Sequence, residues 1–285
     1  MAIAVPSTSN SGGYAATAVI PKPTGLQVGD TLIALIESSS GSGSLNTPAG
    51  WTVAVLGSWS LTDQAIYYKV ADAGDVAAAD FTFTDTVGTR MGGALLRVTG
   101  LPPSVIVSDF EAIQELGANS ATIALDCTVA PTHALSLVVV IVSGHNTGTS
   151  PSSISAFVST PAITFTEVFD QEANVSAVDP VAAGAYGIQA SLANITNFGA
   201  TIANSREDHH GVIAVFTPQG DAAGTAALLV DEPEFFAPAA TVGGTGTNAL
   251  LVAEPEIPDP VGRETHPTPW TAPSKTSTIW TPESK

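Results

Sequence analysis

The sequence predicts an all-β protein, in which a two-sheet antiparallel β-sandwich of jelly-roll type is followed by a long extended, mostly irregular C-terminal arm. Through residues 1–220, short runs rich in Val, Ile, Thr, Phe and Tyr alternate with clusters of Gly, Pro, Ser, Asn and Asp, and almost no segment is helical in pattern. The composition changes after Pro218, since residues 221–285 hold nine of the 20 prolines and too few periodic apolar residues for a core. We therefore expect a sandwich domain at 1–220 and an acidic, proline-rich docking arm at 221–285.

Ten segments of the first region are predicted strands. Phe81–Thr84 alternates apolar and polar residues, which is typical of a strand with one wet face, whereas Leu135–Val142 is nearly continuous and must be covered on both faces. Two sheets that face each other would satisfy both patterns. In chain order, the predicted strands are Thr31–Glu37, Trp51–Trp59, Ala65–Val70, Asp80–Thr84, Gly92–Val98, Ser120–Val129, Leu135–Ser143, Ile163–Asp170, Ala185–Ala190 and Gly211–Thr217.

The second half of this region repeats the first in order. Each half has a Leu/Ile/Val-rich strand, a polar loop, a strand preceded by Thr-Pro, a strand with Tyr and a closing strand that begins at Gly. The matched pairs are Leu32–Ile36 with Leu137–Ile141, Thr47–Thr52 with Thr160–Phe165, Ile66–Tyr68 with Ala185–Gly187, and Gly93–Leu96 with Gly211–Ala214. We expect both halves to supply comparable strands to one sandwich, as the two Greek keys of a jelly roll do.

Charge and hydropathy exclude several classes of protein. The net charge is −18, with 8 Lys+Arg against 26 Asp+Glu, so a phosphate backbone would be repelled and nucleic acid is not an expected partner. The longest apolar run, Ala134–Val142, is far shorter than the roughly 18 to 20 residues of a spanning helix, so no membrane insertion is expected. Met1–Asn10 lacks the basic start and apolar stretch of a secretory signal.

Motifs of known chemistry are missing from the sequence. It has no Gly-x-Ser-x-Gly elbow, phosphate loop, dinucleotide fingerprint or His-Glu-x-x-His helix. Cys127 lies in an apolar strand, where a buried inert thiol is expected. We therefore predict no enzyme activity, no catalytic residue and no cofactor.

Two groups of residues have the types that bind metals. Glu207–His210, with His133 and His145 elsewhere, contains imidazole and carboxylate ligands, but a solvated loop explains the segment equally well. Asp72, Asp75, Asp80 and Asp85 surround the Phe81 strand, where carboxylates suit calcium, but the spacing does not match an EF-hand. Because turn aspartates are favoured for their own backbone hydrogen bonds, we predict no metal site.

Four aromatic residues are candidates for stacking on a sugar. Trp51, Trp59 and Tyr67 can form a platform for a host-surface glycan, and Tyr68 is the fourth member of the group. Alternation places Tyr67 and Tyr68 on opposite faces of one strand, so at most one of them is exposed. Packing in the core is the alternative role of these rings.

Several short motifs in a fixed order carry a resemblance. They are Val28–Ala34, Thr47–Thr52, Tyr67–Ala71, Phe81–Thr84 and Gly93–Arg97. Together they resemble a β-sandwich module of phage tail and other virion-associated proteins, phage minor tail proteins in particular, and of some bacterial surface proteins. The resemblance covers roughly residues 5–218. It implies a sandwich architecture and a virion or cell-surface setting, without a fixed catalytic set.

The arm contains two repeats. Gly224–Glu234 recurs as Gly246–Glu256 with nine of 11 positions identical, and a shorter repeat pairs Trp270–Lys275 with Trp280–Lys285. In the longer repeat a short Ala-Leu-Leu-Val strand is stopped by Glu-Pro, because proline donates no hydrogen bond to a ladder and keeps its predecessor extended. Such a unit fits the addition of a strand to an exposed sheet edge, with its acidic flank steering it toward a basic rim, and two copies add avidity.

These features predict that the arm docks on neighbouring subunits, whereas a flexible linker with accidental repetition is the alternative. The two tryptophans are candidate anchors, because a buried Trp contributes strongly to binding. The predicted partner-binding residues are Leu228, Leu229, Val230, Phe235, Phe236, Leu250, Leu251, Val252, Trp270 and Trp280.

We thus expect a non-enzymatic virion structural protein, a phage minor tail or tail-tip protein, whose partners are other virion subunits and further copies of itself. A capsid decoration protein is one alternative, distinguished by where the arm lands. A host-attachment module that binds a cell-surface glycan is the other.

Overall fold

The computed structural model describes residues 2–39, 43–87, 90–116, 120–145, 153–172, 181–206 and 208–219. Each of the ten predicted strands is a strand, and the only described helix, α1 (Ala73–Ala77), is a single short turn. The strands are β1 (Ala4–Asn10), β2 (Ala18–Pro21), β3 (Thr31–Ser38), β4 (Thr52–Ser58), β5 (Asp63–Val70), β6 (Asp80–Phe83), β7 (Met91–Thr99), β8 (Val107–Glu115), β9 (Ser120–Val129), β10 (Ser136–His145), β11 (Ile154–Thr160), β12 (Phe165–Glu172), β13 (Val181–Gln189), β14 (Ile195–Arg206) and β15 (Asp208–Phe216).

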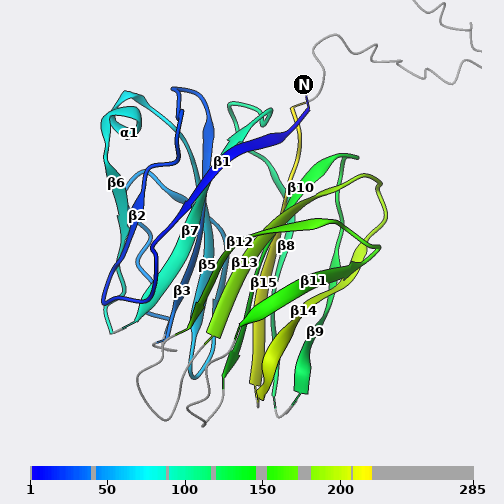
Figure 1. The fold of residues 1–285 in the computed structure, drawn as a ribbon. Coiled ribbons are helices and arrows are strands. Elements are labelled where there is room, and N and C mark those ends of the chain that lie inside the picture. Colours follow the sequence, from blue (N-terminus) through cyan, green and yellow to red (C-terminus); the bar gives the residue numbers. More distant parts are fainter. Residues whose placement is uncertain are drawn as a thin grey trace, which may run out of the picture. The chain divides into compact units, whose positions relative to one another are not determined.

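The strands form four antiparallel sheets. Two large sheets have the orders β1-β7-β3-β5-β4 and β12-β13-β10-β15-β8, and two smaller sheets have the orders β2-β6 and β11-β14-β9. Figure 1 shows them as successive layers, from β2 and β6 at the left to β14 and β9 at the right. The two large sheets are the inner layers of this stack.

Three hydrophobic clusters hold the layers together. The central cluster joins the two large sheets and includes Leu35 and Ile141, the second joins the β10 sheet to the β9 sheet, and the third joins the β3 sheet to the β2–β6 pair. Every residue of β3 and of β10 is buried. Both strands are continuous apolar runs because both of their faces lie against another sheet.

The prediction of two facing sheets is therefore wrong in the number of layers. A two-sheet sandwich leaves one face of each sheet in water, and a strand such as β10 would then expose every second apolar side chain. The predicted covering of Leu135–Val142 on both faces is correct. That burial is achieved by two sandwiches stacked through their larger sheets, and each half of the chain builds one of them.

The two halves have the same strand order. Reading β1-β7-β3-β5-β4 beside β8-β15-β10-β13-β12 makes each strand of the first sheet equivalent to one of the second. The hydrogen-bond register supports the match, because Tyr68 pairs with Ile33 as Tyr186 pairs with Val139. The sequence comparison matches Tyr67 to Tyr186 and is wrong by one residue, whereas its pairing of Gly93 with Gly211 agrees with the register.

Irregularities recur at equivalent places too. A β-bulge lies between Val53 and Val55 in β4, and another lies between Glu167 and Phe169 in β12. The halves also contact each other reciprocally, since β4 packs on β8 and β15, and β12 packs on β1 and β7. The central interface therefore has the pattern of a two-fold pair formed within one chain.

Two further predictions concern membrane insertion and the C-terminal arm. No helix among the described residues is long and apolar enough to cross a membrane. The predicted arm, residues 221–285, lies outside the described part of the chain.

Candidate functional site

One end of the central interface is polar. Gln64 of β5 donates from Nε2 to Ser143 Oγ of β10 at 2.8 Å, which links the two large sheets. Glu37 is the cross-strand neighbour of Gln64, and its Oε1 accepts from Thr62 Oγ1 at 3.1 Å. Each of these four residues is 0% exposed. They replace the aliphatic and aromatic side chains that fill the rest of the interface.

The carboxyl of Glu37 is the most perturbed acid of this cluster. Burial raises its pKa to about 8, while hydrogen bonding to Thr62 opposes the rise. The Tyr14 hydroxyl is buried nearby, and burial followed by the charge of Glu37 holds the pKa of Tyr14 well above its usual value. Interaction with the Tyr14 hydroxyl also opposes the rise in the Glu37 pKa, and neither Tyr14 Oη nor Glu37 Oε2 has another hydrogen-bond partner within the described residues. Glu37 is therefore largely protonated at neutral pH, which avoids an uncompensated buried charge.

Histidines extend the polar end. The rings of His145 and His210 are 5.5 Å apart, and His210 lies 4.9 Å from the Trp59 ring, measured between centroids. Gln114 Nε2 is 3.0 Å from His210 Nε2. Burial lowers the pKa of His210 to about 4, so this ring is neutral at pH 7.

The residues considered as possible metal ligands do not converge. His210 faces the central interface, whereas the adjacent His209 lies on the other face of β15, with Nδ1 at 3.7 Å from Glu115 Oε2. His133 lies elsewhere, with Nδ1 at 3.1 Å from the Thr132 hydroxyl, and Glu207 is not among the described residues. In the ranges that the structure describes, no three His, Cys, Asp or Glu side chains are grouped as metal ligands.

The turn aspartates bond to their own backbone. Asp72 caps α1 by accepting from the Asp75 N–H at 3.0 Å, and Asp75 accepts in return from the Asp72 N–H at 2.9 Å. Asp75 also pairs with Lys69 at 2.7 Å. Asp85 accepts from the Val87 N–H, while Asp80 begins β6. These contacts are those of a capping box and a turn.

Cys127 is buried, and its Sγ lies 3.3 Å from the Ile195 carbonyl oxygen, to which it donates. Burial raises the pKa of this thiol to about 12, so it is not a nucleophile at neutral pH.

The predicted aromatic platform is not formed. Tyr67 is 1% exposed and stacks on Phe83 in the outer cluster, where Trp51 meets Phe83 edge to face. Trp59 lies at the opposite end of β4 and packs against the central cluster. Tyr68 faces that same cluster. The three predicted sugar-binding rings therefore do not share one exposed face.

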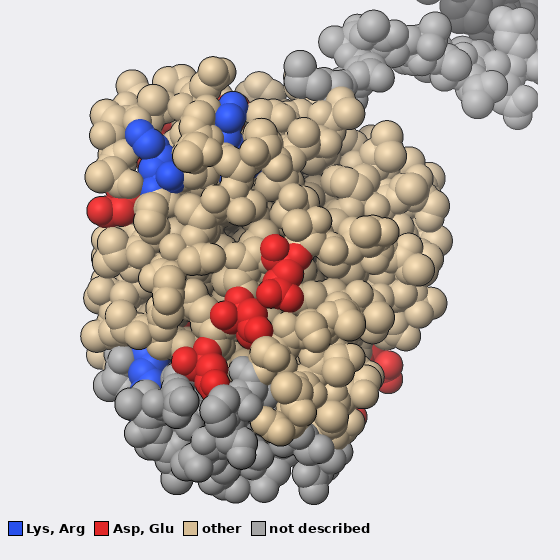
Figure 2. Space-filling view, viewed as in Figure 1, with Lys and Arg blue, Asp and Glu red and all other residues tan. Residues whose placement is uncertain are grey.

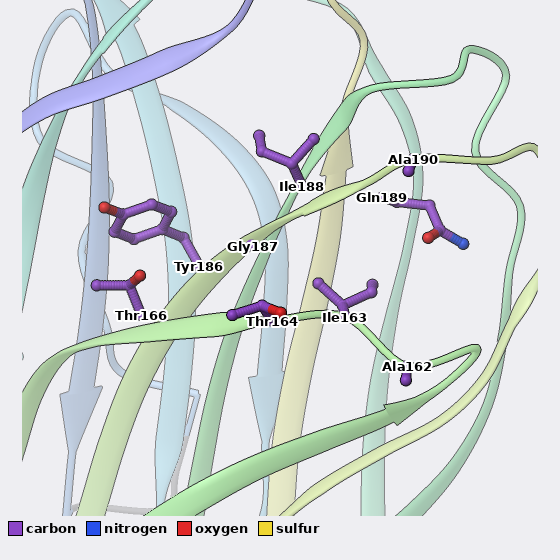
Figure 3. Close-up of a pocket in the computed structure, with 9 residues that line it drawn as sticks. All are labelled: Ala162, Ile163, Thr164, Thr166, Tyr186, Gly187, Ile188, Gln189 and Ala190. Atoms are coloured by element: carbon purple, nitrogen blue, oxygen red, sulfur yellow. The ribbon is translucent and has the colours of Figure 1, made fainter.

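A pocket of about 400 Å³ lies where the chain enters β12. Figure 3 shows Tyr186 and Thr166 close together and Ile163 beside Thr164, with Gln189 at the far end of the pocket. The lining has hydroxyl, amide and apolar groups without a charged side chain: Ala162, Ile163, Thr164, Thr166, Tyr186, Gly187, Ile188, Gln189 and Ala190. It can hold a small neutral ligand, but it offers no general acid or base that titrates near neutral pH.

The sequence contains signals for the polar end that the prediction did not use. Alternation along β3 places Ile33, Leu35 and Glu37 on the same face, so Glu37 continues an inward-facing row. Gln64 stands opposite it in β5. The sequence pattern alone does not place Ser143 opposite Gln64, because only the stacking of the two sandwiches brings them together.

Comparison with known proteins gives no relative: no protein-family model matches the chain, and neither a curated protein nor a solved structure matches it significantly. The predicted docking residues, from Leu228 to Trp280, lie outside the described residues and stay predictions.

Proposed function

We propose that the chain is a non-enzymatic structural protein of a phage virion, a minor tail or tail-tip component, whose C-terminal arm anchors it to neighbouring subunits and to further copies of itself. Each half is a jelly-roll-type sandwich in this proposal, and the stacked pair is a rigid body that carries the arm. The motifs between Val28 and Arg97 that resemble phage virion modules support the setting.

The observation that carries the proposal is the repeated segment in the arm. Nine of 11 positions agree between Gly224–Glu234 and Gly246–Glu256, and the repeated unit is a short apolar strand closed by Glu-Pro. A sequence that only needed to be a flexible tether would not require Leu-Leu-Val at two places. An apolar strand outside a core is stabilised by pairing with another sheet.

Truncation after Gly220 tests the proposal. The truncated chain should fold and stay soluble, because the described members of the three hydrophobic clusters all precede residue 217, but it should no longer be incorporated into particles. The measurement is the amount of the chain in purified particles, with the circular dichroism of the free protein as the control for folding.

Normal incorporation of the truncated chain would refute the docking role of the arm. Incorporation of the full chain into heads rather than tails would instead identify a capsid decoration protein.

A further inference from the structure

Because the two halves share one strand order, two sides of the described residues have the same backbone arrangement and can be compared; we call them flanks. The edge strand β4 lies beside β8 on one flank, and its equivalent β12 lies beside β1 on the other. The same backbone arrangement therefore occurs twice with different side chains. A residue type that appears on only one flank is not dictated by the shared fold.

On the flank of β1 and β12, side-chain hydrogen bonds connect β12 to the end of β1, and β12 carries negatively charged side chains. Asn10 Nδ2 donates to the Val168 carbonyl at 3.4 Å, and Gln171 Nε2 donates to Ser11 Oγ at 3.0 Å. β12 also carries Glu167, Asp170 and Glu172. Figure 2 shows a diagonal row of acidic side chains over the position of β12 in Figure 1. Charges of this kind commonly block the edge of a sheet.

The flank of β4 and β8 lacks the equivalents of these bonds. The positions of Asn10 and Ser11 are taken there by Ala112 and Ile113, and that of Gln171 is taken by Gly57. None of these three side chains can form the corresponding hydrogen bond.

Apolar residues replace the acids on β4. Val53 and Leu56 stand where β12 has Glu167 and Asp170, and they are 38% and 43% exposed. Phe110 of β8 is 55% exposed where β1 has Thr8. The other flank forms the same fold with polar residues at these positions, so the fold itself does not require apolar side chains here. The three exposed apolar side chains are therefore available for binding a partner.

β4 is also an open edge. Among the described strands it is the last of its sheet and pairs only with β5, and none of its seven residues is charged. An uncharged edge with outward apolar side chains is a template for one more strand.

We infer that β4 of one copy receives an Ala-Leu-Leu-Val strand from the arm of a neighbouring copy, either Ala227–Val230 or Ala249–Val252. The chain continues outside the described residues from 220 to 285, and these two segments are its uninterrupted Leu-Leu-Val runs. Glu-Pro-Glu follows each of them, so the three acids of β12 repel the arm, whereas uncharged β4 does not. Val53 and Leu56 then pack against leucines of the added strand.

This inference rests on the proposed docking role of the arm and specifies its partner as a second copy of the chain. The two are separable, because the truncation experiment asks whether the arm is needed in particles, whereas β4 is tested with the purified protein.

The test is amide hydrogen exchange of the intact chain, followed by mass spectrometry of peptides that contain Leu228–Val230 and Leu250–Val252. At high protein concentration, exchange of at least one repeat should be slowed by about tenfold or more, and dilution should remove this protection. The double variant V53E/L56D copies the acids of β12 onto β4 and should abolish the protection. Its matched control, V158E/L192D, makes the same chemical changes at side chains that are 56% and 60% exposed elsewhere, and it should leave the protection intact.

Protection that survives in V53E/L56D, or that is lost equally in the control, would overturn the assignment to β4. Protection independent of concentration, or no protection at any concentration, would exclude a neighbouring copy as the acceptor. In each of these cases the arm has another acceptor than β4 of a neighbouring copy. The proposed function still stands if the arm is required in particles.

Discussion

Glu37 shows how a single residue can set the pH dependence of this fold. Its carboxyl is fully buried, with its pKa raised from 4.5 to about 8, so folding favours the protonated acid. The contribution of Glu37 to stability is therefore fully present below pH 4.5 and is lost as the pH rises toward 8. The buried His210, with its pKa lowered to about 4, acts in the opposite sense in acid.

Glu37→Gln tests this description at the scale of the residue. Glutamine keeps an acceptor for Thr62 but cannot ionise, so the variant should gain stability relative to the parent between pH 4.5 and 8. The size of the effect is roughly 4 to 5 kcal/mol at most, since one unit of pKa corresponds to about 1.4 kcal/mol. Urea unfolding of both proteins at pH 5 and pH 8 measures it. An equal change with pH in the two proteins would show that Glu37 is not the group responsible.

At the scale of the element, the sequence predicts strands best where apolar residues follow a clear pattern. β3 is found to within one residue from its continuous apolar run, and β9 is found at both ends from its alternation of apolar and polar residues. Five strands are missed: β1, β2, β8, β11 and β14. β1 reads Ala-Val-Pro-Ser-Thr-Ser-Asn, which has the composition of a turn. It is a strand because its backbone pairs with β7, and the Ser7 and Ser9 hydroxyls also donate to the Thr24 and Pro21 carbonyls.

The predicted number of sheets is wrong, although the sequence limits it. Eight consecutive buried residues in β3 and ten in β10 require cover on both faces of both strands, which one two-sheet sandwich does not provide. The position of Glu37 in an inward-facing row indicates a buried polar group, but the hydrogen bond between Gln64 and Ser143 cannot be anticipated, because these residues meet only when the sandwiches stack.

Two equivalent glycines test the pairing of strands within each half. A Cβ on Gly93 would lie 2.0 Å from the Leu35 carbonyl oxygen, at a φ of +157°, whereas a Cβ on Gly211 would lie 3.0 Å from the Ile141 oxygen and closest to a Leu125 methyl. Gly93→Ala should therefore destabilise the fold by about 3 kcal/mol or more, and Gly211→Ala by about 1 to 3 kcal/mol. Chemical unfolding measures both, and a larger effect at Gly211 would contradict the described strand packing.

At the scale of the whole molecule, the proposed function gives the stacked sandwiches and the arm separate roles, as a rigid body and as a docking segment. The pairing of equivalent sheets buries the apolar faces of the large sheets, so few apolar side chains remain exposed on β1 and β12. The arm has the opposite character, because its apolar runs are short and separated by acids and prolines. In the proposed function, an arm of this composition would gain order from a sheet that another molecule supplies.

A cryo-EM map of the particle that contains the chain tests the proposed docking role of the arm most directly. The expected result is density for Leu228–Val230 or Leu250–Val252 as an added strand on a neighbouring subunit, with β4 of a second copy as the first place to look. An arm that packs only against its own sandwiches, with no second molecule within reach, would contradict the account.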